Sequence, residues 1–327
     1  MEEKDYPQTL QQAIIYFANQ DTCVQFVAQI RWPDGKPVCP KCDGKEHSYL
    51  TTRRVWKCKV CKKQFSVKVG TIFEDSPLGL DKWLAAIWMI ANDKNGISSY
   101  EIHRGLGITQ KTAWFMMHRI RLAMQTGTFE KLSGQVEADE TFIGGKARNM
   151  HSDKRKAKIK GRGATGKVVV MGVLERHGEV RASVVPDRKR VTLHGEIRKH
   201  VVKGSELFTD ELASYLGLDA EYVHQVINHA EKYVDGHVHT NGMENYWSLL
   251  KRTIKGTYVS VEPFHLFRYL DEQAFRFNGR KGKDRDRFLD VANSVSGRRL
   301  MYKQLIGEAD ATERKSSAGE EETAQVI

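Results

Sequence analysis

Two pairs of cysteines constrain the fold of this 327-residue chain more than any other feature of its sequence. Cys39 and Cys42 form one Cys-x2-Cys pair, and Cys58 and Cys61 form a second pair after fifteen intervening residues. This spacing is typical of a zinc ribbon, because each pair supplies two thiolates to one tetrahedral ion. Buried thiols or a redox-active pair are the alternatives. Cys23 is left over, and we expect it to be a buried small apolar residue.

The balance of charge indicates a polyanionic partner. The chain contains 52 Lys and Arg residues against 41 Asp and Glu residues, although residues 308 to 327 are acidic. Such an excess of positive charge favours nucleic acid, because neutralised phosphates release condensed counterions. The longest apolar run, Trp83 to Ala91, is too short to cross a bilayer, and the N-terminus does not resemble a secretory signal. We therefore expect a cytoplasmic protein with no membrane partner.

Helical patterns dominate the first part of the chain outside the cysteine region. Residues 10 to 30 should form one or two short helices, and three more are expected between residues 78 and 128. Asp81 and Thr109 are expected N-caps, and Ser98 with Glu101 fits a capping box. The order is typical of a helix-turn-helix, although an ordinary three-helix unit gives the same pattern. The candidate DNA contacts of its third helix are Gln110, Lys111, Thr112 and Arg119.

The pattern changes to short segments rich in β-branched residues after Ser133. Three strands are expected within residues 134–145, 167–177 and 179–187, then a helix over 192–202 and strands within 205–212 and 221–228. A later helix follows. This order predicts a mixed β-sheet flanked by helices.

A basic stretch separates the first two expected strands. Nine of the residues from Lys146 to Lys167 are Lys or Arg, and Asp153 is the one acid among them. The stretch is either a solvated loop or an arm that contacts phosphates, and its charge density favours the arm. Its candidate DNA contacts are Lys154, Arg155 and Lys156.

Two acids lie within apolar strand candidates, and a third begins a later helix. Asp139 and Asp210 need a hydrogen-bonding or metal partner if they face the interior, and Glu137 shares the face of Asp139. Glu244 precedes Lys251 by seven residues, so both lie on one helical face. Hard oxygen ligands suit Mg²⁺ or Mn²⁺, and two such ions can activate water and clamp a phosphodiester. Scattered surface acids are the alternative.

Four runs of sequence together resemble a known family. VEADETFIGGK, FTDELASY, INHAEKYVDGHVHTNGMENYWSLLKRTIKGTY and HLFRYLDEQAFRFNGR are similar to bacterial insertion-sequence transposases that carry an N-terminal zinc ribbon and an RNase H-like domain of the DDE type. The resemblance covers roughly residues 15 to 290. It implies that Asp139, Asp210 and Glu244 hold the catalytic metals and that Lys251, followed by Arg252, contacts DNA. Related members use Asn as the third ligand, which makes Asn241 the alternative to Glu244.

These observations predict an α+β multidomain protein. Its expected parts are a helical segment (1–36), a zinc ribbon (37–74), a helix-turn-helix region (78–128), an RNase H-like catalytic domain (133–295) and a disordered acidic tail (308–327).

The expected function is that of a transposase that binds the terminal inverted repeats of an insertion sequence in double-stranded DNA and catalyses metal-dependent cleavage and strand transfer. Two ends must be joined, so a homodimer or higher assembly is expected, located in a bacterial cytoplasm and on the nucleoid when bound to DNA. The alternatives are a zinc-ribbon transcriptional regulator with a degenerate catalytic domain and a metal-dependent nuclease without joining activity.

Overall fold

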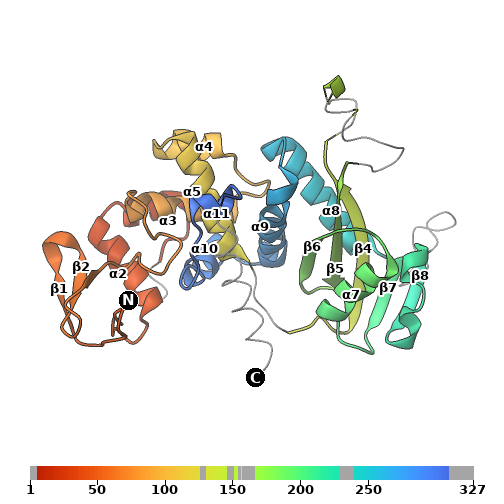
Figure 1. Cartoon of the computed structure of the whole chain (residues 1–327), viewed down its shortest axis with the longest axis horizontal. Coiled ribbons are helices and arrows are strands. Elements are labelled where there is room, and N and C mark those ends of the chain that lie inside the picture. Colours follow the sequence, from red (N-terminus) through yellow and green to blue (C-terminus); the bar gives the residue numbers. More distant parts are fainter. Residues whose placement is uncertain are drawn as a thin grey trace. The chain divides into compact units, whose positions relative to one another are not determined.

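The computed structural model describes residues 6–125, 130–145, 151–153, 156, 166–227 and 239–308. The chain divides into two compact units (Figure 1). The first comprises the described parts of Met1–Ile87, Ser99–Ala123 and Leu289–Ile327, and the second comprises those of Trp88–Ser98 and Met124–Phe288. Within the described residues, no helix is both long and apolar enough to cross a membrane.

The first unit opens with two short helices, as the sequence predicts. The side chain of Thr9 caps α1 (Leu10–Tyr16), and that of Asn19 caps α2 (Gln20–Arg31). A three-stranded antiparallel sheet follows, in which β2 (Val55–Cys58) lies between β1 (His47–Leu50) and β3 (Gln64–Phe65). The rings of Trp32, Trp56 and Phe65 pack together beside this sheet, so aromatic contacts supply a core that so few residues could not otherwise build.

Three helices occupy the region in which a helix-turn-helix is predicted. They are α3 (Leu80–Asn92), α4 (Ser99–Leu106) and α5 (Gln110–Met124). Gly107 has a φ of 59°, which allows the tight turn between α4 and α5. The hydroxyl of Thr109 accepts a hydrogen bond of 3.2 Å from the amide of Thr112, so the predicted cap of α5 is confirmed. The helix-turn-helix itself stays a prediction.

The second unit is built on a mixed five-stranded sheet, and its strands match the five predicted ones. Along the sheet the strand order is β6-β5-β4-β7-β8. β4 pairs antiparallel with β5 and parallel with β7; β5 with β6 is antiparallel and β7 with β8 is parallel. The bounds of the strands are Gln135–Ile143 (β4), Val168–Glu175 (β5), Val180–Val185 (β6), Glu206–Asp210 (β7) and Val223–Ile227 (β8).

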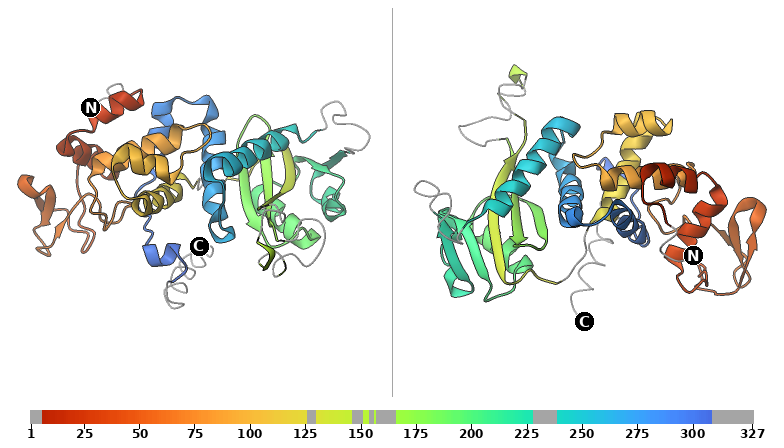
Figure 2. Two further views of the ribbon diagram at one scale, coloured as in Figure 1. Left: turned by 90° about the horizontal axis from the view of Figure 1, so that it is seen from above. Right: turned by 180° about the vertical axis from the view of Figure 1, so that it is seen from behind.

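Helices cover both faces of this sheet (Figure 2). α7 (Arg190–His200) packs on the face that holds Val136 and Ala138 of β4, at the position predicted for a helix. α8 (Asn241–Thr253) and α9 (Leu266–Asn278) pack on the opposite face. Because side chains alternate along a strand, Glu137 and Asp139 point toward the α8 face.

The remaining elements are short. A π-helical segment, η6 (Ile254–Tyr258), continues α8, and α10 (Asp284–Asn293) and α11 (Tyr302–Leu305) follow α9. Five 3-10 turns are also present in the described residues: η2 (Thr51–Arg53), η4 (Ala213–Tyr215), η5 (Leu218–Ala220), η7 (Pro263–His265) and η8 (Gly279–Lys281). The predicted acidic tail lies outside the described residues from residue 309 onward.

Candidate metal centre and catalytic site

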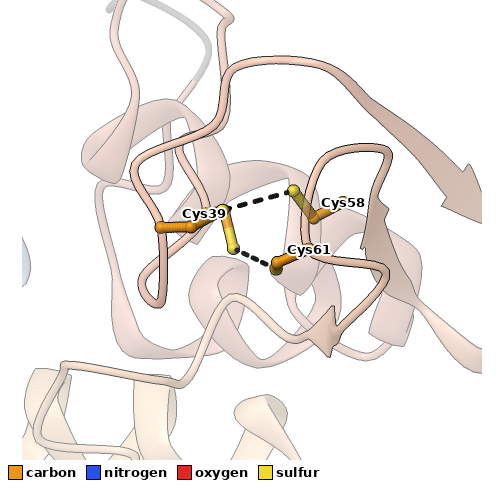
Figure 3. Close-up of side chains that lie close together, drawn as sticks. Cys39, Cys58 and Cys61 are labelled. Atoms are coloured by element: carbon orange, nitrogen blue, oxygen red, sulfur yellow. Dashed lines mark hydrogen bonds between the residues drawn. The ribbon is translucent and has the colours of Figure 1, made fainter.

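The four predicted zinc ligands come together in the first unit. The sulfurs of Cys39, Cys42, Cys58 and Cys61 all lie within 4.8 Å of one another. Sγ of Cys39 lies 3.6 Å from that of Cys61 (Figure 3), and Sγ of Cys42 lies 3.7 Å from that of Cys58. Tetrahedral zinc with bonds of about 2.3 Å to sulfur separates its ligands by about 3.8 Å. The cluster therefore fits Zn²⁺.

Two turns of the same shape hold these cysteines. The amide of Cys39 donates to the carbonyl of Gly44, and the amide of Cys58 donates to that of Lys63. The residue after each Cys-x2-Cys pair, Asp43 or Lys62, has a φ near 60°. Hydrogen bonding, first from the backbone amide of Cys61, lowers the pKa of Cys58 to about 7. In the same cluster the pKa of Cys42 is raised to about 12, because the neighbouring sulfurs share hydrogen bonds, so the geometry of the four sulfurs and not their pKa values carries the assignment of zinc.

Cys23 lies apart from this cluster in α2. It is fully buried, and its thiol donates to the carbonyl of Phe17 over 3.1 Å. Burial raises the pKa of this thiol to about 12. The prediction of a buried apolar cysteine is confirmed.

Cys39→Ser should remove bound zinc and unfold the ribbon. A structural zinc ion contributes roughly 10 kcal/mol or more to the folding of small domains, and β1, β2 and β3 offer little apolar area to replace it. The zinc content measured by elemental analysis should fall from one ion per chain to near zero, and proteolysis should cut within residues 37–74. Cys23→Ser is the control, and it should retain its zinc. Full zinc content in Cys39→Ser would contradict the assignment.

Asp139 occupies a half-buried position in the middle of β4. Its Oδ2 accepts a hydrogen bond of 2.9 Å from Nε1 of Trp247, and its Oδ1 accepts one of 2.8 Å from the amide of Glu140. Burial, followed by the charges of Glu140 and Asp210, raises the pKa of Asp139 to about 7. A carboxyl that is costly to ionise calls for a compensating positive charge.

Asp210 ends the neighbouring parallel strand β7. Glu137 of β4 pairs with Phe208 of β7. Asp139 and Asp210 each follow two residues later on their strands, so continuing this register brings the two acids side by side. Oδ1 of Asp210 accepts a hydrogen bond of 3.1 Å from the amide of Leu212. Two neighbouring, half-buried carboxylates form a donor set of hard oxygens that fits a divalent cation such as Mg²⁺ or Mn²⁺.

The other predicted catalytic residues lie on α8. Asn241 and Glu244 are exposed in its first turn, Lys251 is half-buried and Arg252 is exposed. Burial lowers the pKa of Lys251, and the charge of Asp139 opposes that change. Within the described residues, the four cysteines are the one group of three or more metal-binding side chains whose ligand atoms lie within 4.8 Å. Asp139, Asp210 and Glu244 therefore do not converge to that distance in this structure.

The candidate DNA contacts of α5 differ in accessibility. Lys111 is exposed, and its Nζ lies 4.7 Å from the ring centroid of Tyr302. Gln110 donates to Ser99 over 2.8 Å, and the hydroxyl of Thr112 lies 2.8 Å from that of Thr109.

Arg119 is a structural residue in this conformation. It is 5% exposed, and its guanidinium donates to the carbonyls of Leu300, Ile72 and Glu74 over 2.9, 3.0 and 2.6 Å. These bonds hold together segments that are distant in the sequence, so the buried guanidinium of Arg119 serves the packing of the first unit and not DNA contact in this conformation. In the predicted basic arm Lys156 is exposed, whereas Lys154 and Arg155 lie outside the described residues.

The sequence did not predict the role of Trp247. Its position in α8 indicated a core residue, and the side chain is indeed buried, but its indole N–H donates to Asp139. Gly172, the register partner of Asp139 on β5, makes this contact possible. A Cβ atom at Gly172 would lie 2.8 Å from the Trp247 ring and 2.4 Å from Met243. A buried indole N–H requires a hydrogen-bond acceptor, and this requirement is the signal that points to a polar partner for Trp247.

Asp139→Asn should alter how stability depends on pH in the absence of divalent cations. The folded-state pKa of about 7 exceeds the ordinary value of 3.8, so the stabilising contribution of protonated Asp139 is complete below pH 4 and lost as the pH rises through 7. We measure the free energy of unfolding by urea denaturation at pH 4 and pH 8. Between these two pH values, the free energy of unfolding of the variant should rise by up to about 4 kcal/mol relative to that of the parent.

Glu211→Gln, which alters an exposed neighbour of Asp210, is the control for this experiment and should follow the parent. Mg²⁺ should stabilise the parent at pH 8 more than it stabilises Asp139→Asn, because a bound ion favours the folded state. If stability depended on pH in the same way in Asp139→Asn and in the parent, the raised pKa of Asp139 would be contradicted.

Comparison with known proteins gives one consistent family. Residues 131–278 match the ISXO2-like transposase domain and residues 18–64 match a transposase zinc-ribbon domain, together more than half of the chain. An uncharacterized protein in the transposable element ISH50 of Halobacterium salinarum is 27% identical over 253 residues, which cover 72% of this chain and 83% of that protein. An uncharacterized transposase-like protein of Haemophilus influenzae is 35% identical over 101 residues, which cover 31% of this chain and 81% of that protein.

Proposed function

The chain belongs to the ISXO2-like family of insertion-sequence transposases, and from this premise we propose that it cleaves and rejoins DNA at a site built on Asp139 and Asp210. The observation that carries the proposal is that these two acids follow paired residues of adjacent parallel strands and lie close enough for the charge of Asp210 to help raise the pKa of Asp139. Carboxylates in such a position are costly unless a cation binds them. Glu244 is the proposed third ligand, with Asn241 as its alternative.

The reaction proposed for this site has two steps. Water first hydrolyses a phosphodiester at the end of the element and frees a 3′-hydroxyl, and this hydroxyl then attacks a phosphorus atom of the target DNA in line and displaces a 3′-oxygen. Bound divalent cations would lower the pKa of the attacking group and stabilise the leaving oxygen. No covalent protein intermediate is required.

The chain's own side chains would orient this chemistry. Trp247 fixes one oxygen of Asp139 by a hydrogen bond of 2.9 Å, which leaves the carboxylate one orientation in which to bind a cation. Lys251 lies close enough to Asp139 for their charges to interact, so its ammonium is suited to a phosphate at the same site. Arg252, on the exposed side of α8, would contact the DNA backbone.

Recognition of the element's ends is assigned to the first unit. The zinc ribbon and the start of α5, with exposed Lys111 and half-buried Gln110 and Thr112, would contact the terminal inverted repeats. The basic arm with Lys154, Arg155 and Lys156 would add sequence-independent phosphate contacts. Because two ends are joined in one event, the active species would be a homodimer or higher assembly on double-stranded DNA.

An assay with labelled terminal-repeat DNA and a plasmid target tests this function. In the presence of Mg²⁺, the protein should produce both cleaved ends and products in which an end is covalently joined to the plasmid. Cleavage without joined products would indicate a nuclease. Specific binding without cleavage, at any divalent cation concentration, would indicate a DNA-binding regulator, and either result would refute the proposal.

A further inference from the structure

A buried ion pair lies beneath the first turn of α8. Glu137 of β4 is 1% exposed and Arg176, between β5 and β6, is 10% exposed, and Nε of Arg176 donates to Oε1 of Glu137 over 2.9 Å. Oε2 of Glu137 accepts a hydrogen bond of 2.9 Å from the amide of Met243. Both oxygens of this carboxylate are therefore occupied, Oε1 by the guanidinium and by Nδ1 of His239 at 3.3 Å, and Oε2 by the N-terminus of α8.

Arg176 connects this carboxylate to the segment that leads into α8. Its Nη2 donates to the carbonyl of His239 over 2.6 Å, and its guanidinium lies 4.0 Å from the ring centroid of Phe208. Phe208 is the register partner of Glu137 on β7. One arginine thus links β4, β7 and the start of α8.

The contacts of Glu137 and Asp139 match each other in spacing. Two residues along β4 span about 7 Å, and four residues along an α-helix span about 6 Å. Glu137 accepts from Met243, and Asp139, two residues later, accepts from Trp247, four residues after Met243. α8 is therefore fixed to β4 at two points one turn apart, which sets both its height and its rotation.

An ion pair is a costly way to fill a space between a sheet and a helix. Removing two charges from water is repaid only when the geometry is good, and apolar side chains of similar volume stabilise such a position at least as well. An ion pair, unlike apolar packing, fixes the orientation of the groups that it joins. Space here is also tight, since a Cβ atom at Gly242 would lie 2.7 Å from Oε2 of Glu137.

We propose that Glu137 and Arg176 are positioning residues, whose buried pair fixes the first turn of α8, which carries Glu244, and so keeps Lys251 within reach of the charge of Asp139. This inference rests on the function proposed above. Glu244 follows Met243 directly, and Lys251 lies one turn beyond Trp247, so a shift of the first turn displaces both. Displacement of a catalytic group by about 1 Å can slow a reaction about 100-fold.

Glu137→Gln is the first test. A glutamine replaces one of the two oxygens with an NH2 group that cannot accept, so it cannot accept from both Arg176 and Met243 without rearranging. Single-turnover cleavage of terminal-repeat DNA should fall about 100-fold, while the Kd for that DNA stays within about threefold of the parent value, because binding of the ends is assigned to the first unit. Hydrogen exchange of the α8 amides should become faster.

The double variant Glu137→Leu with Arg176→Met separates positioning from stability. It removes both charges, so the melting temperature should return toward that of the parent. Cleavage should stay about 100-fold slow, because the hydrogen bond to Met243 is still missing. Glu272→Gln, which breaks the buried pair of Glu272 and Arg276 in α9, is the matched control and should lose stability without a comparable loss in cleavage.

Recovery of cleavage together with stability in the double variant would overturn the inference, as would unchanged hydrogen exchange in α8 of Glu137→Gln. A parent protein that binds the ends and never cuts them would instead refute the proposed function. In that case the exchange measurement still decides whether the pair holds α8.

Discussion

Asp139→Asn and Asp210→Asn should each abolish DNA cleavage and strand transfer while leaving terminal-repeat binding intact. Each substitution removes an anionic oxygen from a site where a divalent cation contributes several kcal/mol to the transition state, and about 1.4 kcal/mol corresponds to a factor of ten. The expected loss in the single-turnover rate of cleavage is therefore roughly 1,000-fold or more. Gel-shift titration on the same DNA should give a Kd close to that of the parent.

The two variants differ in what else they change. Asp139 accepts hydrogen bonds from Trp247 and from the amide of Glu140, and its asparagine can keep both through its one carbonyl oxygen only by rearranging. Asp210 bonds to the amide of Leu212, which an asparagine oxygen can satisfy. Asp210→Asn therefore removes a charge with less disturbance of hydrogen bonds than Asp139→Asn. Glu211→Gln, at the next residue, is the matched control. Strand transfer that survives Asp210→Asn would refute the proposed site.

The strands and the zinc ligands could be predicted because their signals are local. Segments rich in β-branched residues gave all five strands of the mixed sheet, and the Cys-x2-Cys spacing gave the metal cluster. The alternation of side chains along β4 also separated Glu137 from Glu140 correctly, since Glu140 bonds to Tyr215 on the α7 side. In each case a short window of sequence determines the geometry.

The contacts that build the site could not be predicted, because they join distant parts of the chain. Trp247 and Asp139 are 108 residues apart, and Arg176 and Glu137 are 39 apart. Arg119 was expected to face DNA, since a basic side chain on a helix is more often exposed than buried. Its three backbone acceptors lie 45 to 181 residues away, and no pattern within α5 reveals them.

The structure is most informative about the identity of the proposed third metal ligand. Helical positions advance by about 100° per residue. Glu244 precedes Trp247 by three residues and so lies about 60° from it around α8, whereas Asn241, six residues before, lies about 120° away. Because the Trp247 indole contacts Asp139, the side of α8 that faces the acids is known. Glu244 is nearer to that side than Asn241.

Glu244→Gln should therefore reduce cleavage far more than Asn241→Ala. Loss of an anionic ligand predicts roughly a 1,000-fold fall in the single-turnover rate, and loss of an exposed amide at the helix start predicts less than about tenfold. Both side chains are exposed in the first turn of α8, so neither change should alter the melting temperature greatly. In a Mg²⁺ titration, the concentration that gives half-maximal cleavage should rise less for Asn241→Ala than for Glu244→Gln. The reverse order of losses would assign the ligand to Asn241 and would mean that α8 rotates toward the acids when metal binds.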